Sequence, residues 1–568
     1  MRLHRKSLTM GVLALCVSGI VAWSLFRPQS APARPLDQLV PEGSMLYIEA
    51  KDFGALLKEW NSCSERLQWL KSDNYRVFST SRLFLRLGEA SDQFAAAAGL
   101  PPNMEFLTEA AGRESAVALY DIGNLEFLFL TRLSSATFLQ SKLWQSRSKF
   151  QPRTAAGKQF YVRKDDASGR VVAFAVVDNY LILATREDLL AGTLELMGGS
   201  KGRSLQQEGW YAQAVAAAPK TAGELRMAMN LKKLAVTPHF RTYWVQQNIT
   251  EMQSYSAAIS DLYREGQVYR EERIIFPEEP ADESALAQSS QAVSSLLSVV
   301  PMNSGFYQVS MADARASVAA LRQKILAPGA SSFVDRKLAP QVQLTSGTAG
   351  SAADLETRID VEPALRGAAD DPGKALLEAL GKATPKAMMV VQATAKTNDG
   401  VLLRIPTVVA IAGAGDWDLA GLERAAQQML APAMTASDLG LQWREVKDAG
   451  GYFELDGLNP VQIAVRGKIV YFANDAELLS TALQARNQPP SGPVTYAGAF
   501  SHARERENFY KLTSLLDQNA RATEQEPQFF SQNIASFSRT FSNLESEEAI
   551  TRQTKDRIQQ TVTYRWIH

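Results

Sequence analysis

A glycine-rich turn is the first pattern in this chain whose residue types could do chemistry. Gly413-Ala414-Gly415 follows the apolar run VVAIA and precedes a predicted helix, which is the setting of a dinucleotide-binding loop. Asp418 stands where that loop requires its third glycine, and Asp416 and Asp418 would repel a pyrophosphate at the helix N-terminus. We therefore expect a tight turn at this position.

A second pattern is the S-x-x-K spacing of Ser146 and Lys149. In some acyl-transfer enzymes this spacing places a lysine one helical turn from a nucleophilic serine. The companion motif K-T-G does not occur in the chain, and serine and lysine are common residues, so we interpret the spacing as coincidental. The sequence also contains no H-E-x-x-H pair, Walker A loop or paired-cysteine zinc spacing.

The remaining reactive side chains are scattered. The four histidines are isolated in the sequence, and we expect surface or capping positions for them: His4, His239, His502 and His568. Glu545, Glu547 and Glu548 are interpreted as part of a solvated face, and Cys16 and Cys63 are not expected to bond to each other. The sequence therefore nominates no catalytic, cofactor-binding or metal-binding residue, and it predicts no cofactor and no enzymatic activity.

Composition limits the class of protein. The chain has 568 residues, of which 46% are hydrophobic, which is enough for about four domain-sized units and typical of a globular protein. Sixty basic and sixty acidic side chains give a formal net charge of zero, so no overall field attracts nucleic acid, and we expect no nucleic-acid partner.

The N-terminus predicts a membrane anchor. The run from Leu8 to Phe26 is uncharged, follows Arg5 and Lys6, and is long enough nearly to cross a hydrocarbon layer. Its basic flank favours a cytoplasmic stub within residues 1–35 and places the rest of the chain outside the cytoplasm. We expect a single-pass inner-membrane protein. Secretion after cleavage of a signal peptide is the alternative, because Ala31-Pro32-Ala33 resembles a cleavage site.

An internal repeat organises the rest of the chain. Val40–Tyr47 matches Val300–Tyr307, and Tyr180–Leu190 matches Ile469–Leu479 at an offset of 289. Two weaker matches keep the same order: Leu107–Gly112 with Leu377–Gly381, and Gln247–Ile249 with Gln532–Ile534. We therefore predict two tandem copies of one unit. Thr185 and Asn474, where a strand passes into an acidic helical turn, are the expected N-caps.

Periodicity predicts similar elements in both copies. In the first, strands are expected at 127–133, 158–163 and 171–185, with helices at 135–145 and 186–197. In the second, strands are expected at 408–412, 452–455 and 461–473, with helices at 419–430 and 477–483. Successive strands without intervening helices favour an α+β fold, an antiparallel sheet with helices on one face.

These elements define the predicted domains. Residues 1–35 form the stub and anchor, with the span at 8–26; residues 36–276 form repeat unit 1; residues 277–296 form a linker; and residues 297–568 form repeat unit 2. Residues 341–373, rich in small and turn residues, are interpreted as an insertion in the second unit.

A regular apolar stripe is expected on a long helix near the end of each unit. In unit 2 it consists of Phe530, Ile534, Phe537, Phe541 and Leu544, and in unit 1 of Val245, Ile249, Met252, Ile259 and Leu262. Packing on the sheet is the simpler interpretation, and a seam with a protein partner or a second copy of the chain is the alternative.

The V-P-x-x-S-x-x-Y opening, the Gly112-Arg113-Glu114 step and the Tyr180–Leu190 ending resemble a family of bacterial membrane-anchored extracytoplasmic proteins with a domain of unknown function. The resemblance implies an exported, anchored α+β protein and transfers no catalytic residues. We expect a non-enzymatic binding or envelope-assembly protein. The alternatives are a carrier or chaperone for an apolar ligand, which a large apolar pocket would favour, and a hydrolase whose residues meet only in three dimensions.

Overall fold

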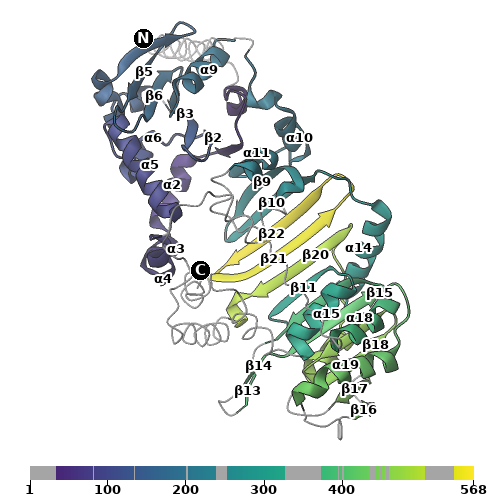
Figure 1. The fold of residues 1–568 in the computed structure, drawn as a ribbon. Helices are drawn as coiled ribbons and strands as arrows, with labels where there is room; N and C mark the ends of the chain where they lie inside the picture. Colours follow the sequence, from purple (N-terminus) through teal and green to yellow (C-terminus); the bar gives the residue numbers. More distant parts are fainter. Residues whose placement is uncertain are drawn as a thin grey trace, which may run out of the picture.

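The protein is an α+β protein built on one large antiparallel sheet (Figure 1). The computed structural model describes residues 34–237, 252–326, 372–434, 442–505 and 543–567, apart from 81, 134, 200, 201, 303, 394, 395, 399–401, 448–450 and 456–459. In the described residues twenty strands form the sheet, and β13 (Lys396–Asn398) and β14 (Leu402–Arg404) form a separate hairpin. The coarse fold class predicted from the sequence is confirmed.

The N-terminal half of the sheet contains ten strands, which pair in the order β4-β5-β6-β7-β3-β2-β1-β8-β9-β10. Their bounds are β1 Leu46–Ala50, β2 Ser115–Asp121, β3 Glu126–Arg132, β4 Gln151–Ala155, β5 Lys158–Lys164, β6 Val171–Val177, β7 Tyr180–Ala184, β8 Leu225–Asn230, β9 Tyr255–Glu265 and β10 Val268–Pro277.

The C-terminal half repeats this pairing scheme, in the order β16-β17-β18-β19-β15-β12-β11-β20-β21-β22. Its strands are β11 Phe306–Met311, β12 Pro385–Gln392, β15 Thr407–Gly413, β16 Trp443–Val446, β17 Tyr452–Leu455, β18 Val461–Arg466, β19 Ile469–Ala473, β20 Val494–Ser501, β21 Leu544–Gln553 and β22 Ile558–Trp566. We call two residues corresponding when they hold the same place in the two schemes.

The two halves join through their last strands. β10 pairs antiparallel with β22 over eight residue pairs, from Val268 opposite Arg565 to Ile275 opposite Ile558. In Figure 1 the yellow strands β21 and β22 lie between teal β10 and green β20 and connect the two lobes. The sheet is therefore continuous from one half to the other, and its midpoint is formed by β9, β10, β22 and β21.

Helices cover both faces of the sheet in the N-terminal half, so the expectation of helices on one face is wrong. On β7, Ile182 and Ala184 belong to one core cluster, whereas Leu181 and Leu183 belong to another on the opposite face. The first face is covered by η1 (Leu36–Gln38), α9 (Glu187–Met197), η3 (Leu205–Gln207) and α10 (Gly209–Ala217). The second is covered by α5 (Arg82–Ala98), α6 (Met104–Ala110), α7 (Ser135–Phe138) and α8 (Lys142–Gln145).

Five further helices of this half lie in the described residues, and one of them, α11, packs on β8 and β9. They are α2 (Phe53–Ser62), α3 (Ser64–Lys71), α4 (Asp73–Phe78), η2 (Ser146–Lys149) and α11 (Leu231–Val236). In Figure 1 α3 and α4 form the tip of a helical arm that continues from α2.

The C-terminal half has the same three layers. α14 (Glu283–Leu297) and α20 (Ala476–Gln484) cover one face of the sheet, and α15 (Ala314–Leu321), η4 (Arg322–Leu326), α18 (Pro372–Lys382) and α19 (Leu419–Met434) cover the other. Most of the expected linker 277–296 is thus the helix α14, whose Val293, Leu296 and Leu297 are buried in this half's core. The expected insertion 341–373 lies outside the described residues except for its last two positions, which begin α18.

Most predicted elements are confirmed near their expected bounds, including β17 at 452–455 and the strand–strand–helix segments that end in α9 and α20. The two expected N-caps are wrong. The Thr185 hydroxyl accepts a hydrogen bond from the Phe127 amide at 2.8 Å, and the Asn474 side chain accepts one from the Thr407 amide at 2.7 Å. Both side chains therefore extend the sheet hydrogen bonding past the strand end, and in α20 the cap is Asp475, one residue later.

The apolar stripe near the end of each unit is only partly within the described residues. Ile259 and Leu262 belong to strand β9, and Leu544 begins β21, so these three positions are not helical and that part of the prediction is wrong. Phe530 to Phe541, Val245 and Ile249 lie outside the described residues, as does the expected span 8–26. Among the helices of the described chain, none combines the length and apolar character needed to cross a membrane.

Candidate ligand-binding cavity

An apolar cavity of about 350 Å³ lies between the N-terminal half of the sheet and helices α5 and α6. Phe127 and Phe129 of β3 and Leu183 of β7 line it from the sheet, and Phe94 and Phe106 line it from the helices. Of its lining residues only Ser91, Arg170 and Thr185 are polar. This size and composition fall within the range of small-molecule sites in proteins.

Local sequence explains why the helices face the sheet here. In α5 the lining residues Leu87, Ala90, Ser91 and Phe94 follow the i, i+3, i+4, i+7 spacing of one helical face. Helix α6 begins after two prolines, and the Asn103 side chain accepts a hydrogen bond from the Phe106 amide at 3.0 Å, as an N-cap does. This cap places the Phe106 ring on the cavity wall, where it contacts the Phe94 ring at a centroid distance of 5.9 Å.

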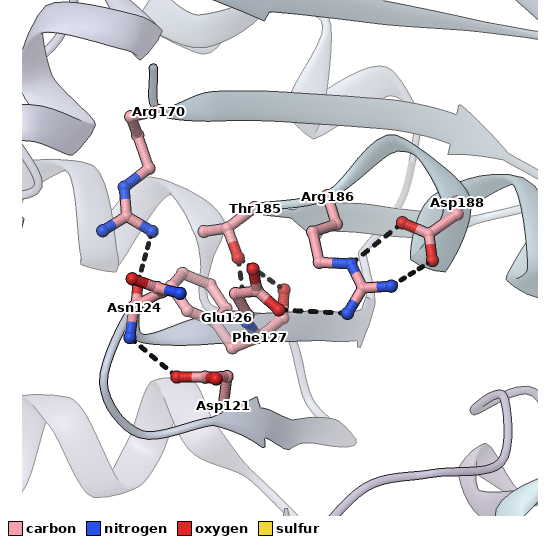
Figure 2. A network of polar contacts seen from close by, with 8 residues as sticks. All are labelled: Asp121, Asn124, Glu126, Phe127, Arg170, Thr185, Arg186 and Asp188. Atoms are coloured by element: carbon pink, nitrogen blue, oxygen red, sulfur yellow. Dashed lines mark hydrogen bonds and ion pairs between the residues drawn. The ribbon is translucent and has the colours of Figure 1, made fainter. Parts of the chain in front are cut away.

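The turn between β2 and β3 forms one side of the cavity rim. The Asp121 carboxylate accepts a hydrogen bond from the Asn124 amide at 2.7 Å, which fixes the turn. Leu125, in the left-handed region at φ 49°, adds its side chain to the cavity lining. The Asn124 carbonyl in turn accepts a hydrogen bond from the Arg170 guanidinium, as Figure 2 shows.

Arg170 is the one charged residue of the cavity lining within the part of the chain that the structure describes. Its guanidinium donates to the Asn124 carbonyl oxygen at 2.5 Å and to the Gln93 Oε1 atom at 3.0 Å, and both acceptors are neutral. Burial lowers the pKa of Arg170. The guanidinium is half-buried and pairs with no carboxylate of the described residues.

The nearby acid Glu126 is already committed to another cation. Arg186 lies 3.0 Å from the Glu126 carboxylate and also binds Asp188 through two nitrogens (Figure 2). These contacts, those with Asp188 first, raise the pKa of Arg186 above its ordinary value. At the rim, Arg186 is therefore paired with two carboxylates, whereas Arg170 forms no ion pair with the described residues.

The same face of the sheet is filled in the C-terminal half. Val390, Val409 and Phe472 correspond to the cavity residues Val117, Phe129 and Leu183. Leu321, Leu376, Leu380 and Leu422 from the covering helices are fully buried in the cluster that includes these residues. The cavity is therefore a feature of the N-terminal half and not a consequence of the shared strand scheme.

A buried polar cluster lies on the opposite face of the N-terminal half. The Arg226 guanidinium binds both oxygens of Asp261 at 2.8 Å, and the Tyr47 hydroxyl donates to Glu49 at 2.8 Å. Burial raises the pKa of Glu49, and it raises the pKa of Asp37 in spite of a hydrogen bond from the Tyr211 hydroxyl. None of these side chains lines the cavity or the groove described next.

A groove of about 820 Å³ lies where the two halves meet. Aromatic side chains line it: Trp60 from α2, Tyr269 from β10, and Tyr564 and Trp566 from β22. Glu547 also lines it, and burial raises the pKa of this carboxyl. Glu545 and Glu548 are exposed, as expected for a solvated face, whereas Glu547 is partly buried.

The sequence candidates form no catalytic arrangement. The amides of Gly413, Ala414 and Gly415 all donate to backbone carbonyls, as expected for a tight turn. Asp418 accepts a hydrogen bond from the Gly421 amide at 3.0 Å, and Ser146 donates its hydroxyl to the Leu143 carbonyl.

Two further serine motifs of the sequence also form no catalytic arrangement. An S-D-N triplet occurs at 72–74, but the Ser72 hydroxyl donates to the Trp69 carbonyl at the end of α3. A G-x-S-x-G pattern occurs at 198–202, where it follows the helix α9 instead of the strand that a nucleophile elbow requires.

The other reactive groups are also separate. His502 contacts the Phe500 ring beside the groove, Cys63 is a free thiol, and no group of three potential metal ligands occurs within the described ranges. His4, His239, His568 and Cys16 lie outside the described residues. Sequence reasoning missed Arg170, which is an isolated arginine before β6 and belongs to no motif.

Comparisons with known proteins identify no family. No family model and no curated protein matches the chain. Solved structures described as crystal forms III and I of TP0453 are 8% identical in sequence to this chain, each at a TM-score of 0.23. Form III covers 46% of this chain and 88% of its own, and form I covers 44% and 82%. Such scores are too low to relate the folds.

Proposed function

We propose that the protein binds an apolar small molecule in the cavity beneath α5 and α6. The observation that carries this proposal is the cavity of about 350 Å³ whose lining is apolar except for Ser91, Arg170 and Thr185. Binding is favourable at an apolar surface of this kind, because a ligand removes the surface from water. The proposal corresponds to the carrier or chaperone alternative from the sequence.

The hydrolase alternative has less support. Its expected mark is a cleft in which polar residues with shifted pKa values meet. The pKa shifts of Asp37 and Glu49 occur in a buried cluster away from the cavity, and the Thr185 hydroxyl at the cavity is already hydrogen-bonded to the Phe127 backbone.

We also infer that the chain contains two copies of one unit. The shared strand scheme supports this, because Tyr47 and Tyr307 hold the same place in it, as do Ala184 and Ala473 at the offset of 289 found in the sequence. Duplication explains why one copy can keep a filled core while the other carries a cavity.

An anchored, extracytoplasmic location remains part of the proposal and rests on the residue 8–26 segment and its basic flank. Alkaline phosphatase fused after His568 is expected to be active. A fusion that is inactive while a cytoplasmic reporter at the same site works would reverse this topology.

A role with a protein partner is a second candidate, favoured by large exposed apolar side chains on the helical arm. Trp60, Leu67 and Leu85 are each about half exposed or more. Crosslinking in the native membrane is expected to join a partner to α2, α3 or α5. Crosslinks confined to other surfaces would count against this candidate.

The ligand proposal is tested with a neutral fluorescent probe, N-phenyl-1-naphthylamine, added to the full chain in lipid nanodiscs, with empty nanodiscs as the blank. Ala90→Phe places a ring in the cavity, where it takes space that the probe would fill. We expect this variant to weaken probe binding at least about tenfold, because the probe then buries less apolar surface. Ala96→Phe, at an exposed position of the same helix, is the matched control and should bind as the wild type does. Equal binding by both variants would refute the proposal.

A further inference from the structure

The charge at the cavity rim identifies the kind of ligand. Of the described residues that line the cavity only Arg170 is charged, and its two hydrogen bonds go to the neutral oxygens of Asn124 and Gln93. A guanidinium has further N–H donors beyond these two, in a planar fork that suits a carboxylate or phosphate.

No acid of the described residues forms an ion pair with this guanidinium, although the charge of Glu126 acts on it from nearby. Glu126 forms its ion pair with Arg186, which also binds Asp188, so both acids pair with the same cation (Figure 2). Asp121 accepts from the Asn124 amide within the turn. Charged groups in partly buried positions are normally paired, because removing an unpaired charge from water is costly.

A second arginine adds to the positive potential at this rim. Arg86 of α5 donates to the Gly123 carbonyl in the same turn, and its charge is one of the causes that lower the pKa of Arg170. Arg86 pairs with Glu89 at 2.6 Å, whereas Arg170 has no such partner among the described residues. An anion bound near Asn124 would therefore give Arg170 the acidic partner that Arg86 already has in Glu89.

We infer that the ligand is a single-chain amphiphile with an anionic head group, its chain in the cavity and its head at Arg170. The inference rests on the proposed function, since it requires the cavity to hold an apolar chain. The cavity volume, near the lower end of the range for ligand sites, suits one chain and not the two chains of a phospholipid. The shared chemistry of the head group is a carboxylate or phosphate that accepts from the guanidinium.

The test compares three ligands with the same chain, hexadecanoate, hexadecyl phosphate and hexadecanol, as competitors of the neutral probe in the nanodisc assay. In the wild type at least one anionic ligand should bind more tightly than the alcohol. Arg170→Gln should weaken that ligand about 10- to 100-fold, the value of a hydrogen bond to a charged group, and leave the alcohol and the probe unchanged. Arg170→Lys should retain part of the preference, and Arg153→Gln, which removes an exposed arginine from the same half, should have no effect.

The outcomes separate the two claims. If alcohol and anions compete equally and Arg170→Gln changes neither, the anionic head group is refuted while the apolar cavity stands. If no ligand and no probe binds the wild type, both fail. Retained probe binding by Arg170→Gln excludes a folding defect as the cause of weaker anion binding.

Discussion

The buried ion pair between Arg226 and Asp261 offers a sharp test of how the N-terminal half is stabilised. The Asp261 side chain is 1% exposed and that of Arg226 11%, and the carboxylate also accepts from the Gly223 amide at 3.0 Å. Asp261→Asn leaves the arginine charge buried without its partner. Breaking a buried pair in this way costs about 3–5 kcal/mol.

The C-terminal half shows which apolar residues could replace the charged ones. Glu49, Arg226 and Asp261 correspond to Val309, Ala497 and Ile550, so one half is apolar where the other is charged. The triple variant Glu49→Val, Arg226→Ala, Asp261→Ile gives these three positions the residues of the C-terminal half. Because an apolar replacement of a buried ion pair is often nearly neutral, the triple variant should be more stable than Asp261→Asn alone.

The assay is urea unfolding of the full chain in mild detergent, followed by tryptophan fluorescence. For an m-value of about 2 kcal/mol per M, a loss of about 3 kcal/mol lowers the midpoint by about 1.5 M. An Asp261→Asn midpoint equal to that of the wild type, or a triple variant less stable than the single one, would refute this account of the pair.

Three further predictions follow from single features. Burial raises the folded pKa of Glu49 above its ordinary value of 4.5, so the stabilisation from its protonated form is complete below pH 4.5 and is lost as pH rises through the folded pKa. Urea midpoints of the wild type should therefore fall over this pH window relative to those of Glu49→Gln. Parallel pH profiles of the two proteins would contradict the assignment. Gly112→Ala should destabilise by about 1–3 kcal/mol, because a Cβ there would lie 2.2 Å from the Arg132 carbonyl oxygen, whereas Gly88→Ala in α5 meets nothing within 4 Å and should stabilise by up to about 1 kcal/mol; melting temperatures that move in the same direction would count against both assignments. Hydrogen exchange should protect the amides along the β10–β22 pairing in the full chain, and rapid exchange there would show that the halves do not share one sheet.

The sequence predicted the parts of the fold in which apolar strands are buried on both faces. β6, β7, β18 and β19 are nearly continuous apolar runs, and the short acidic turns after β7 and β19 mark the helices that follow. The offset of 289 read from Tyr180 and Ile469 coincides with corresponding positions in the strand pairing. The apolar runs and the acidic turns were predictable because each can be recognised within a short stretch of sequence.

The long hairpins near the end of each half were not predictable in the same way. β10 contains the charged run Arg270–Arg273, and β22 contains polar residues such as Gln559 and Gln560, so neither strand reads as an apolar run. In β9 the spacing of Ile259 and Leu262 also fits a helical face, and the pairing with β8 and β10 decides in favour of a strand.

The candidate site was also beyond reach of sequence patterns. The cavity depends on how far α5 and α6 stand from the sheet, which differs from the filled core of the C-terminal half although the strand scheme is the same. Arg170 acquires its role from the Asn124 carbonyl and the Gln93 side chain, which come from distant parts of the chain.

The central claim, that an apolar chain occupies the cavity, is tested most directly by photo-crosslinking. A hexadecanoate analogue with a diazirine in mid-chain is bound to the full chain in nanodiscs, irradiated and mapped by mass spectrometry of peptides. Labels should fall on α5, α6 and β3, around Phe94, Phe106 and Phe129, and Ala90→Phe should abolish them while Ala96→Phe keeps them. Labels that fall instead on the groove residues Trp60 and Trp566, or that persist in Ala90→Phe, would contradict the account.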